Sequence, residues 1–186
     1  MIKFYVTLSP LSCYTSNVLQ NTEVIVLFKI GDKVVCPRYG IGILKNIEDR
    51  ELFGTTQTYY VIESLSENMT ISIPFSKSES FHLRPINSSI SLEETLHILK
   101  QKENLNVGTI SFKERYNLNK QKLASGFLND CSEVVRDLNF IKKSKPLNSS
   151  ERTQFAIAKQ LVTDEISLIK NVSKEQAVDL VNALLA

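Results

Sequence analysis

The sequence predicts an α+β chain made of a small β domain followed by an all-α domain. Residues 28–74 alternate apolar and polar positions between turns that contain glycine or asparagine, as short antiparallel strands do. From about Ser91 onward the apolar residues instead recur every three or four positions, as they do along one face of a helix. The pattern changes just after Arg84-Pro85, so we expect the two domains to meet there.

Four segments of the β domain have the alternation and the length of strands. They are Lys33–Cys36, Ile41–Asp49, Thr56–Ser64 and Met69–Ile73. Pro37 and Pro74 should end strands, because proline cannot donate a hydrogen bond to an interior ladder. Five or so short strands in a segment of this length favour a small SH3-like or Tudor-like antiparallel β-barrel. Such a barrel often leaves one strand edge open to a partner.

About five helices are expected after residue 85, and four of them have a recognisable start. In each start a Ser or Asn precedes a Glu or Gln by three positions, so that the two side chains can cap free backbone N–H groups. These pairs are Ser91 with Glu94, Ser111 with Glu114, Asn148 with Glu151, and Ser173 with Gln176. Gly126 should end the second helix, and Lys145-Pro146 should separate the third helix from the fourth.

We place the domain boundaries at residues 1–26, 27–84 and 85–186. The first segment fits neither of the two patterns. It is interpreted as a flexible leader, as an extra edge strand around Glu23–Leu27, or as the product of a start codon assigned too far upstream. These three alternatives stay open from the sequence.

The composition is that of an ordinary soluble globular protein, with 42% hydrophobic residues, 23% charged residues and a net charge of +2. No apolar run approaches the length of a membrane span. The three cysteines, Cys13, Cys36 and Cys131, are far apart and lack CxxC spacing. This usage fits reduced thiols, and we expect a cytoplasmic protein.

The residue pattern argues against an enzyme. His82 and His97 are the only histidines, and together with the scattered cysteines they form no set of metal ligands. The sequence has no phosphate-binding glycine loop and no nucleophile elbow. We therefore expect no catalytic residue, no cofactor, no bound metal and no small-molecule substrate.

The positive charge is concentrated in residues 112–145, which hold eight basic and four acidic residues. This local excess favours contact with a phosphate backbone, because binding releases condensed counterions. It equally fits the solvated faces of two ordinary helices. Charge alone leaves both interpretations open.

Several strings of the sequence occur in the same order in a known family. They are FKIGDKVVCPRYGIG (Phe28–Gly42), MTISIP (Met69–Pro74), LRP (Leu83–Pro85), RY (Arg115-Tyr116), KLASG (Lys122–Gly126) and EVVRDL (Glu133–Leu138). Through these strings the chain from Phe28 to Ala186 resembles the CarD/CdnL family of bacterial transcription regulators. The β domain is also similar to the polymerase-binding domain of transcription–repair coupling factors, but no Walker or helicase motif follows it.

The resemblance implies a regulator that makes two contacts. The Tudor-like domain would bind the β subunit of bacterial RNA polymerase, partly by strand addition. The helical domain would contact promoter DNA at the upstream edge of the melted region. The protein would then stabilise the open promoter complex by binding promoter states with different affinity, and it would be associated with the nucleoid.

The resemblance places the polymerase-binding positions at Arg50, Leu52 and Ser72. Arg50 falls where the family has a basic contact, and Leu52 follows on the same strand face. Ser72 is a departure, because this position is basic in some relatives. The alternative for Arg50 is a solvated strand residue beside Asp49 and Glu51.

The resemblance also implies a DNA contact at the start of the second helix. The family commonly has a tryptophan there, which wedges against a minor-groove base, whereas this chain has no tryptophan and carries Phe112. A phenyl ring can still insert or stack, although it lacks the indole N–H donor. The alternative is that Phe112 is a core or staple residue. The other implied DNA-binding positions are Lys113, Arg115, Asn117, Lys120 and Lys122.

Two further expectations concern arginines. Arg115 is an implied phosphate contact but could instead brace the fold, and Arg136 could pair with Asp137 inside the protein. A second functional hypothesis is an adaptor that docks on the polymerase without productive DNA contact. The missing tryptophan and the acidic Glu114 favour it.

Overall fold

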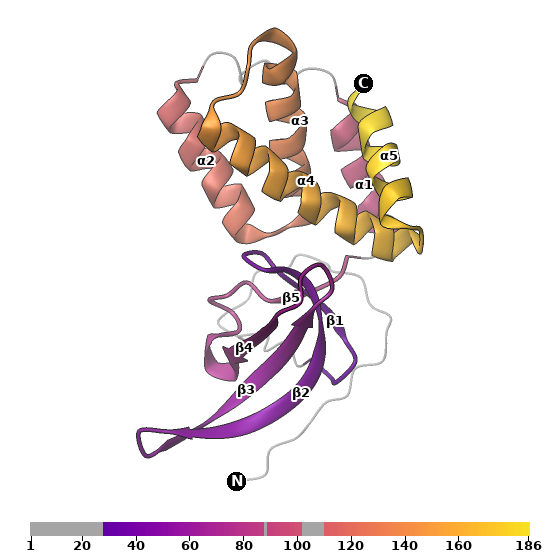
Figure 1. The fold of residues 1–186 in the computed structure, drawn as a ribbon. Helices are drawn as coiled ribbons and strands as arrows, with labels where there is room; N and C mark the ends of the chain where they lie inside the picture. Colours follow the sequence, from indigo (N-terminus) through magenta and orange to yellow (C-terminus); the bar gives the residue numbers. More distant parts are fainter. Residues whose placement is uncertain (1–27, 88, 102–109) are drawn as a thin grey trace, which may run out of the picture.

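The computed structural model describes residues 28–87, 89–101 and 110–186. Figure 1 shows a sheet module, made of strands β1 to β5, with a helical module of helices α1 to α5 stacked against one end of it. The predicted two-part α+β organisation is confirmed. The expected leader, residues 1–26, lies outside the described residues.

The five strands form one antiparallel sheet with the order β4-β3-β2-β1-β5. Their bounds are β1 Lys33–Cys36, β2 Gly40–Leu52, β3 Thr55–Ser64, β4 Thr70–Pro74 and β5 Arg84–Pro85, with a 3₁₀ turn at Phe75–Lys77. All four predicted strands are present. β5 was not predicted, because two residues are too few to show an alternation.

The sheet is open, which corrects the expected closed barrel. β4 and β5 form its opposite edges, and no strand pairing between them occurs among the described residues. Closure needs edge strands long enough to hydrogen-bond to each other. Here β5 has two residues and pairs only with Val34 and Val35 of β1, so the sheet remains open.

The outer part of the β2–β3 hairpin projects beyond the rest of the sheet (Figure 1). β1 pairs with β2 only as far as Ile43, and β4 pairs with β3 only from Tyr59 onward. A register shift between Leu44 and Asn46 separates the two parts of β2. Beyond that irregularity, β2 and β3 extend as a two-stranded ribbon, which we call the projecting hairpin (residues 48–58).

A two-residue turn closes the projecting hairpin. Leu52 pairs with Thr55, and the residues between them, Phe53 and Gly54, have φ angles of 52° and 75°. Positive φ at both central positions is what a type I′ turn requires, and this turn matches the right-handed twist of the strands. Glycine adopts that conformation readily, whereas Phe53 adopts it at a cost.

Five helices lie in the described part of the helical module. They are α1 Ser89–Lys100, α2 Phe112–Ser125, α3 Leu128–Ser144, α4 Ser149–Lys170 and α5 Lys174–Leu185. The predicted caps at Ser111, Asn148 and Ser173 are confirmed, and the last two are complete capping boxes. Among the described residues, no helix combines the length and the apolarity that a membrane span would need.

The predicted start of the first helix at Ser91 is wrong by two residues. α1 begins at Ser89, so Ser91 and Glu94 lie within the helix. Its cap position falls at residue 88, outside the described residues. The Ser-x-x-Glu spacing also occurs inside helices, where both residues are tolerated, so the spacing alone does not fix a boundary.

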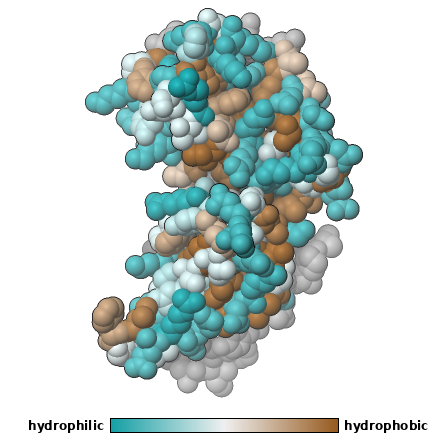
Figure 2. All heavy atoms as spheres, viewed as in Figure 1, coloured by the Kyte–Doolittle hydropathy of each residue, from teal (hydrophilic) through white to brown (hydrophobic). Residues whose placement is uncertain are grey.

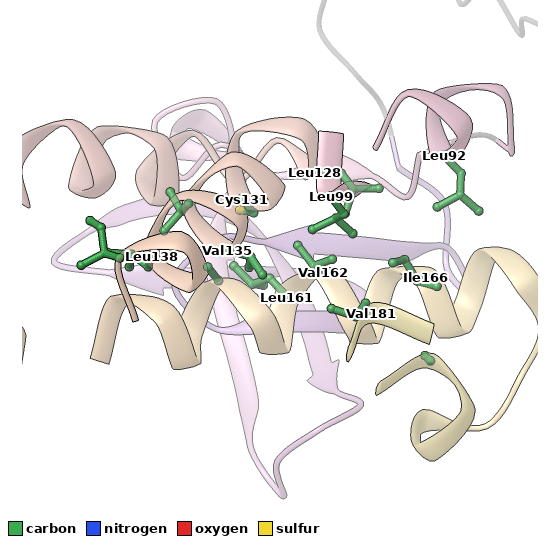
Figure 3. Packing of buried hydrophobic residues seen from close by; sticks show 14 of the residues in the cluster. Leu92, Leu99, Leu128, Cys131, Val135, Leu138, Leu161, Val162, Ile166 and Val181 are labelled. Carbon is green, nitrogen blue, oxygen red and sulfur yellow. The ribbon is translucent and has the colours of Figure 1, made fainter. Parts of the chain in front are cut away.

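Each module has its own apolar core. The core of the sheet module comprises Phe28, Val34, Cys36, Leu44, Tyr60, Ile62, Ile73 and Leu83. The helical core is larger, and Figure 3 shows side chains from α1, α3, α4 and α5 meeting in it. The two periodicities of the sequence follow from this, because strand residues that face the first core alternate, whereas helix residues that face the second recur every three or four positions.

An ion pair that is largely shielded from solvent joins the modules. Arg84, on β5, donates from Nη1 and Nη2 to the two carboxylate oxygens of Glu165 on α4, each at 2.8 Å. Its side chain is 11% exposed and that of Glu165 is 2% exposed. Arg84 also donates to the carbonyl oxygen of Gly126, which follows α2. One guanidinium therefore connects the sheet edge with two helical segments.

Two further contacts belong to this joint. The Ser66 hydroxyl in the β3–β4 turn donates to the Asp164 carboxylate at 2.9 Å. Gly126, with φ of 65°, caps α2 as predicted and lies so close to Pro37 that an added Cβ would overlap the proline ring. We call these contacts, made by Arg84, Glu165, Gly126, Pro37, Ser66 and Asp164, the inter-module joint.

Candidate functional site

The projecting hairpin brings two of the predicted polymerase-binding positions together. Arg50 Nη2 donates to Ser72 Oγ at 3.1 Å, although the residues are on β2 and β4. The guanidinium also pairs with Glu48 and lies over the ring of Tyr59, with Cζ 5.2 Å from the centroid. Arg50 is thus held in a defined position, yet its side chain remains 42% exposed.

The apolar end of the hairpin lies beside this cluster. Leu52 is on the same strand face as Arg50 and is 48% exposed, and the Phe53 side chain at the turn is fully exposed. Figure 2 shows hydrophobic atoms at this end of the molecule. In the described part of the chain no strand covers the outer edge of β4, where Ser72 lies. An edge strand, a fixed cation and an apolar tip thus adjoin one another.

The start of α2 carries the second candidate surface. Ser111 accepts a hydrogen bond from the Glu114 backbone N–H and so begins the helix. Phe112 is the first helical residue and is 46% exposed, which disfavours the core alternative. Its ring contacts that of Tyr116, one turn later, with 6.2 Å between centroids. The two rings form an aromatic pair at the helix start, in which Phe112 is exposed and Tyr116 is half-buried.

Three of the implied DNA-binding positions share one exposed face of α2. Lys113, Asn117 and Lys120 are spaced by four and three residues, which places them above one another on a helix. All three are exposed, and neither lysine has a carboxylate within 4.0 Å among the described residues. This face can therefore offer two cations and an amide to an external anion.

The other two implied positions are engaged within the protein. Arg115 is buried, and its Nη2 lies 2.6 Å from Oε1 of Glu151 on α4. This geometry supports the bracing alternative for Arg115. Lys122 forms an ion pair with Glu133 on α3 at 2.6 Å, and its side chain is 18% exposed. Neither residue is presented to the exterior as Lys113 and Lys120 are.

The predicted internal pair is confirmed. Arg136 and Asp137 are both buried, with Nη2 2.8 Å from Oδ1. Burial raises the pKa of Asp137, although the adjacent guanidinium opposes the shift. Burial likewise raises the pKa of Cys36 to about 11 and that of Cys131 to about 12. These thiols are therefore protonated and inert at neutral pH.

Sequence reasoning missed Tyr116 as the aromatic partner of Phe112 and Glu165 as the partner of Arg84. The first could have been found from the four-residue spacing on a helix. The signal for the second was a carboxylate among apolar core positions of the fourth helix. Within the described ranges there is no group of three or more His, Cys, Asp or Glu side chains that could hold a metal ion.

Comparisons with known proteins agree with these observations. Residues 28–87 match the CarD-like/TRCF RID domain, and residues 94–182 match the CarD C-terminal domain. A Bacillus subtilis (strain 168) protein named "Putative transcription factor YdeB" is 37% identical over 150 residues, which cover 81% of this chain and 97% of that protein. The chain therefore belongs to the CarD-like family and is a transcription regulator.

Proposed function

We propose that the protein binds the β subunit of bacterial RNA polymerase through its sheet module and contacts promoter DNA through α2, so that it stabilises the open promoter complex. Family membership supports the type of partner. The projecting hairpin and the start of α2 are two separate exposed surfaces, and the inter-module joint holds their modules together. This arrangement supports one contact with polymerase and another with DNA. The protein forms and breaks no covalent bonds in this mechanism.

The observation that carries the polymerase contact is the hydrogen bond between Arg50 and Ser72 beside the uncovered edge of β4. A strand of the partner can add to that edge through backbone hydrogen bonds. The guanidinium of Arg50 then meets an acidic or carbonyl group, and Leu52 supplies apolar area. Ser72 stands where some relatives have a basic residue, and its hydroxyl orients the guanidinium of Arg50.

The DNA contact rests on the exposed start of α2. Phe112 can insert against an unpaired base at the edge of the melted region, and an apolar wedge of this kind offsets unstacking costs of a few kcal/mol. Lys113 and Lys120 contact phosphates on either side and set the register. Because the Phe112 contact exists only when the duplex is distorted, the protein binds the open state more tightly than the closed one.

Capture of RNA polymerase by the immobilised full-length chain tests the docking surface. Arg50→Glu should weaken capture by about tenfold or more, because it repels the group that Arg50 attracts and releases Ser72. Lys33→Glu is the matched control, since it reverses an exposed strand charge away from the projecting hairpin. Equal capture by both variants would refute this docking surface.

The second candidate function is an adaptor without productive DNA contact. The engagement of Arg115 and Lys122 with Glu151 and Glu133 favours it, because α2 then has fewer cations to offer than its sequence suggests. An adaptor would be captured by polymerase and would leave the lifetime of open complexes unchanged.

A further inference from the structure

A second cationic cluster lies elsewhere on the helical module. Lys142 of α3 and Lys159 of α4 both approach the ring of Phe155, with Nζ atoms 5.7 and 5.8 Å from its centroid. Phe155 itself packs against the helical core, so the ring is a fixed platform. Two ammonium groups are thereby gathered around one point of the surface. We call these three residues the Phe155 cluster.

The charge of this cluster is not neutralised by the protein. No carboxylate lies within 4.0 Å of either ammonium group in the described part of the chain. Lys159 donates instead to the neutral amide oxygen of Asn182 on α5, at 2.6 Å. Burial and the charge of Lys142 both lower the pKa of Lys159. Two like charges are thus held close together, and an external anion would relieve their repulsion.

Several other cations of the helical module are already engaged within the protein. Arg115, Lys122, Arg136 and Lys174 each have a carboxylate partner. Lys143, next to Lys142, donates to the carbonyl oxygens of the last two residues. The Phe155 cluster therefore stands out by its arrangement, since it combines two cations, a fixed ring and a neutral acceptor.

The cluster is separate from the α2 surface. α4 contacts α2 through Glu151 and Gln154, which bond to Arg115 and to the Tyr116 carbonyl. Phe155 and Lys159 instead face the neighbouring helices α3 and α5. A ligand on this side would touch the module at a second place.

We propose that the Phe155 cluster is a second phosphate-binding surface, and that its ligand is the backbone of duplex DNA. Lysine ammonium groups bind phosphate as point charges without demanding a planar, bidentate geometry. The cluster is open to the surface, since Lys142 is exposed, and it suits an extended polyanion. A DNA strand presents about one phosphate per 3.4 Å, so neighbouring phosphates can reach both ammonium groups. This site does not require the polymerase.

The test is fluorescence anisotropy of a labelled duplex titrated with the full-length chain at salt concentrations between about 50 and about 200 mM. The double variant Lys142→Gln, Lys159→Gln should reduce the slope of log affinity against log salt by about 1.8, since each lost phosphate contact contributes about 0.9. The ratio of wild-type affinity to variant affinity should accordingly fall about tenfold between about 50 and about 200 mM salt. Circular dichroism checks that the variant is folded.

Two matched variants make the result specific. Lys33→Gln with Lys77→Gln removes the same charge from exposed positions of the sheet module and should leave the slope unchanged. Lys142→Arg with Lys159→Arg keeps both charges and should retain the wild-type slope. Lys113→Gln with Lys120→Gln removes the phosphate contacts proposed for α2 and lowers the slope independently, so a failure of the α2 contact is recognised separately.

Three outcomes would overturn the proposal. The first is an unchanged slope in the double glutamine variant. The second is a wild-type chain that does not bind the duplex even at about 50 mM salt. The third comes from a parallel titration with polyglutamate: loss of polyglutamate binding with an intact duplex slope would assign the cluster to an acidic protein surface.

Discussion

The inter-module joint and the exposed face of α2 use basic residues in opposite ways. At the joint, Arg84 is largely removed from solvent and both of its terminal nitrogens meet the Glu165 carboxylate. On α2, Lys113 and Lys120 are exposed and lack such a partner in the described part of the chain. The comparison shows that burial and a carboxylate partner, and not membership of a basic segment, decide whether a cation is available to an external anion.

Arg115 makes the same point within a single helix. It lies two residues after Lys113, but its side chain turns toward α4 and pairs with Glu151. The local excess of positive charge that first indicated phosphate binding is therefore divided. Part of it holds helices together, and part of it faces outward.

The largest expected effect is that of Glu165→Ala. This change leaves the largely buried guanidinium of Arg84 without a counter-charge, and breaking a buried pair in this way typically costs about 3–5 kcal/mol. Urea-induced unfolding of the variant measures the loss. Glu63→Ala is the matched control, because it breaks the exposed pair with Lys45 and should cost less than about 1 kcal/mol. Similar losses in the two variants would contradict a structural role for the joint.

Arg115→Ala sharpens the comparison within α2. We expect it to lower the free energy of unfolding by about 3 kcal/mol, because it leaves the Glu151 carboxylate buried and unpaired. Lys113→Ala and Lys120→Ala should each change it by less than about 0.5 kcal/mol, as exposed substitutions usually do. If Arg115→Ala is as mild as the lysine variants in the same urea titration, Arg115 is not a bracing residue.

How much the sequence predicts depends on how local the cause is. Capping residues such as Asn148 and the stop at Gly126 act within one turn of chain, so their spacing was sufficient. The pair formed by Arg84 and Glu165 joins residues 81 positions apart, and no periodicity encodes that contact. The failure of the sheet to close into a barrel was missed for the same reason, because it depends on how few residues β5 contributes.

The candidate site shows the same contrast between local and long-range causes. The resemblance supplied Arg50 and Ser72 as separate positions, and the structure places them in one hydrogen bond. It also implied phosphate contacts at both Lys113 and Arg115, with bracing of the fold as the alternative for Arg115. Their different burial follows from where α4 packs against α2, which the sequence of α2 does not contain.

Two glycine variants with smaller expected effects separate the cost of backbone strain from the cost of a clash across the inter-module joint. Gly126→Ala places a side chain at φ of 65° and against Pro37, and should cost about 2 kcal/mol. Gly54→Ala meets a similar backbone angle, 75°, with no atom near the added Cβ, so only about 1 kcal/mol is expected. Thermal unfolding compares them. Equal losses would mean that the approach to Pro37 adds nothing.

The lifetime of open promoter complexes after addition of a competitor tests the central claim most directly. Saturating wild-type protein should lengthen this lifetime, and Phe112→Ala should lose most of the gain while still being captured by polymerase. An unchanged lifetime with wild-type protein that is demonstrably bound to polymerase would contradict the account and leave the adaptor function in its place.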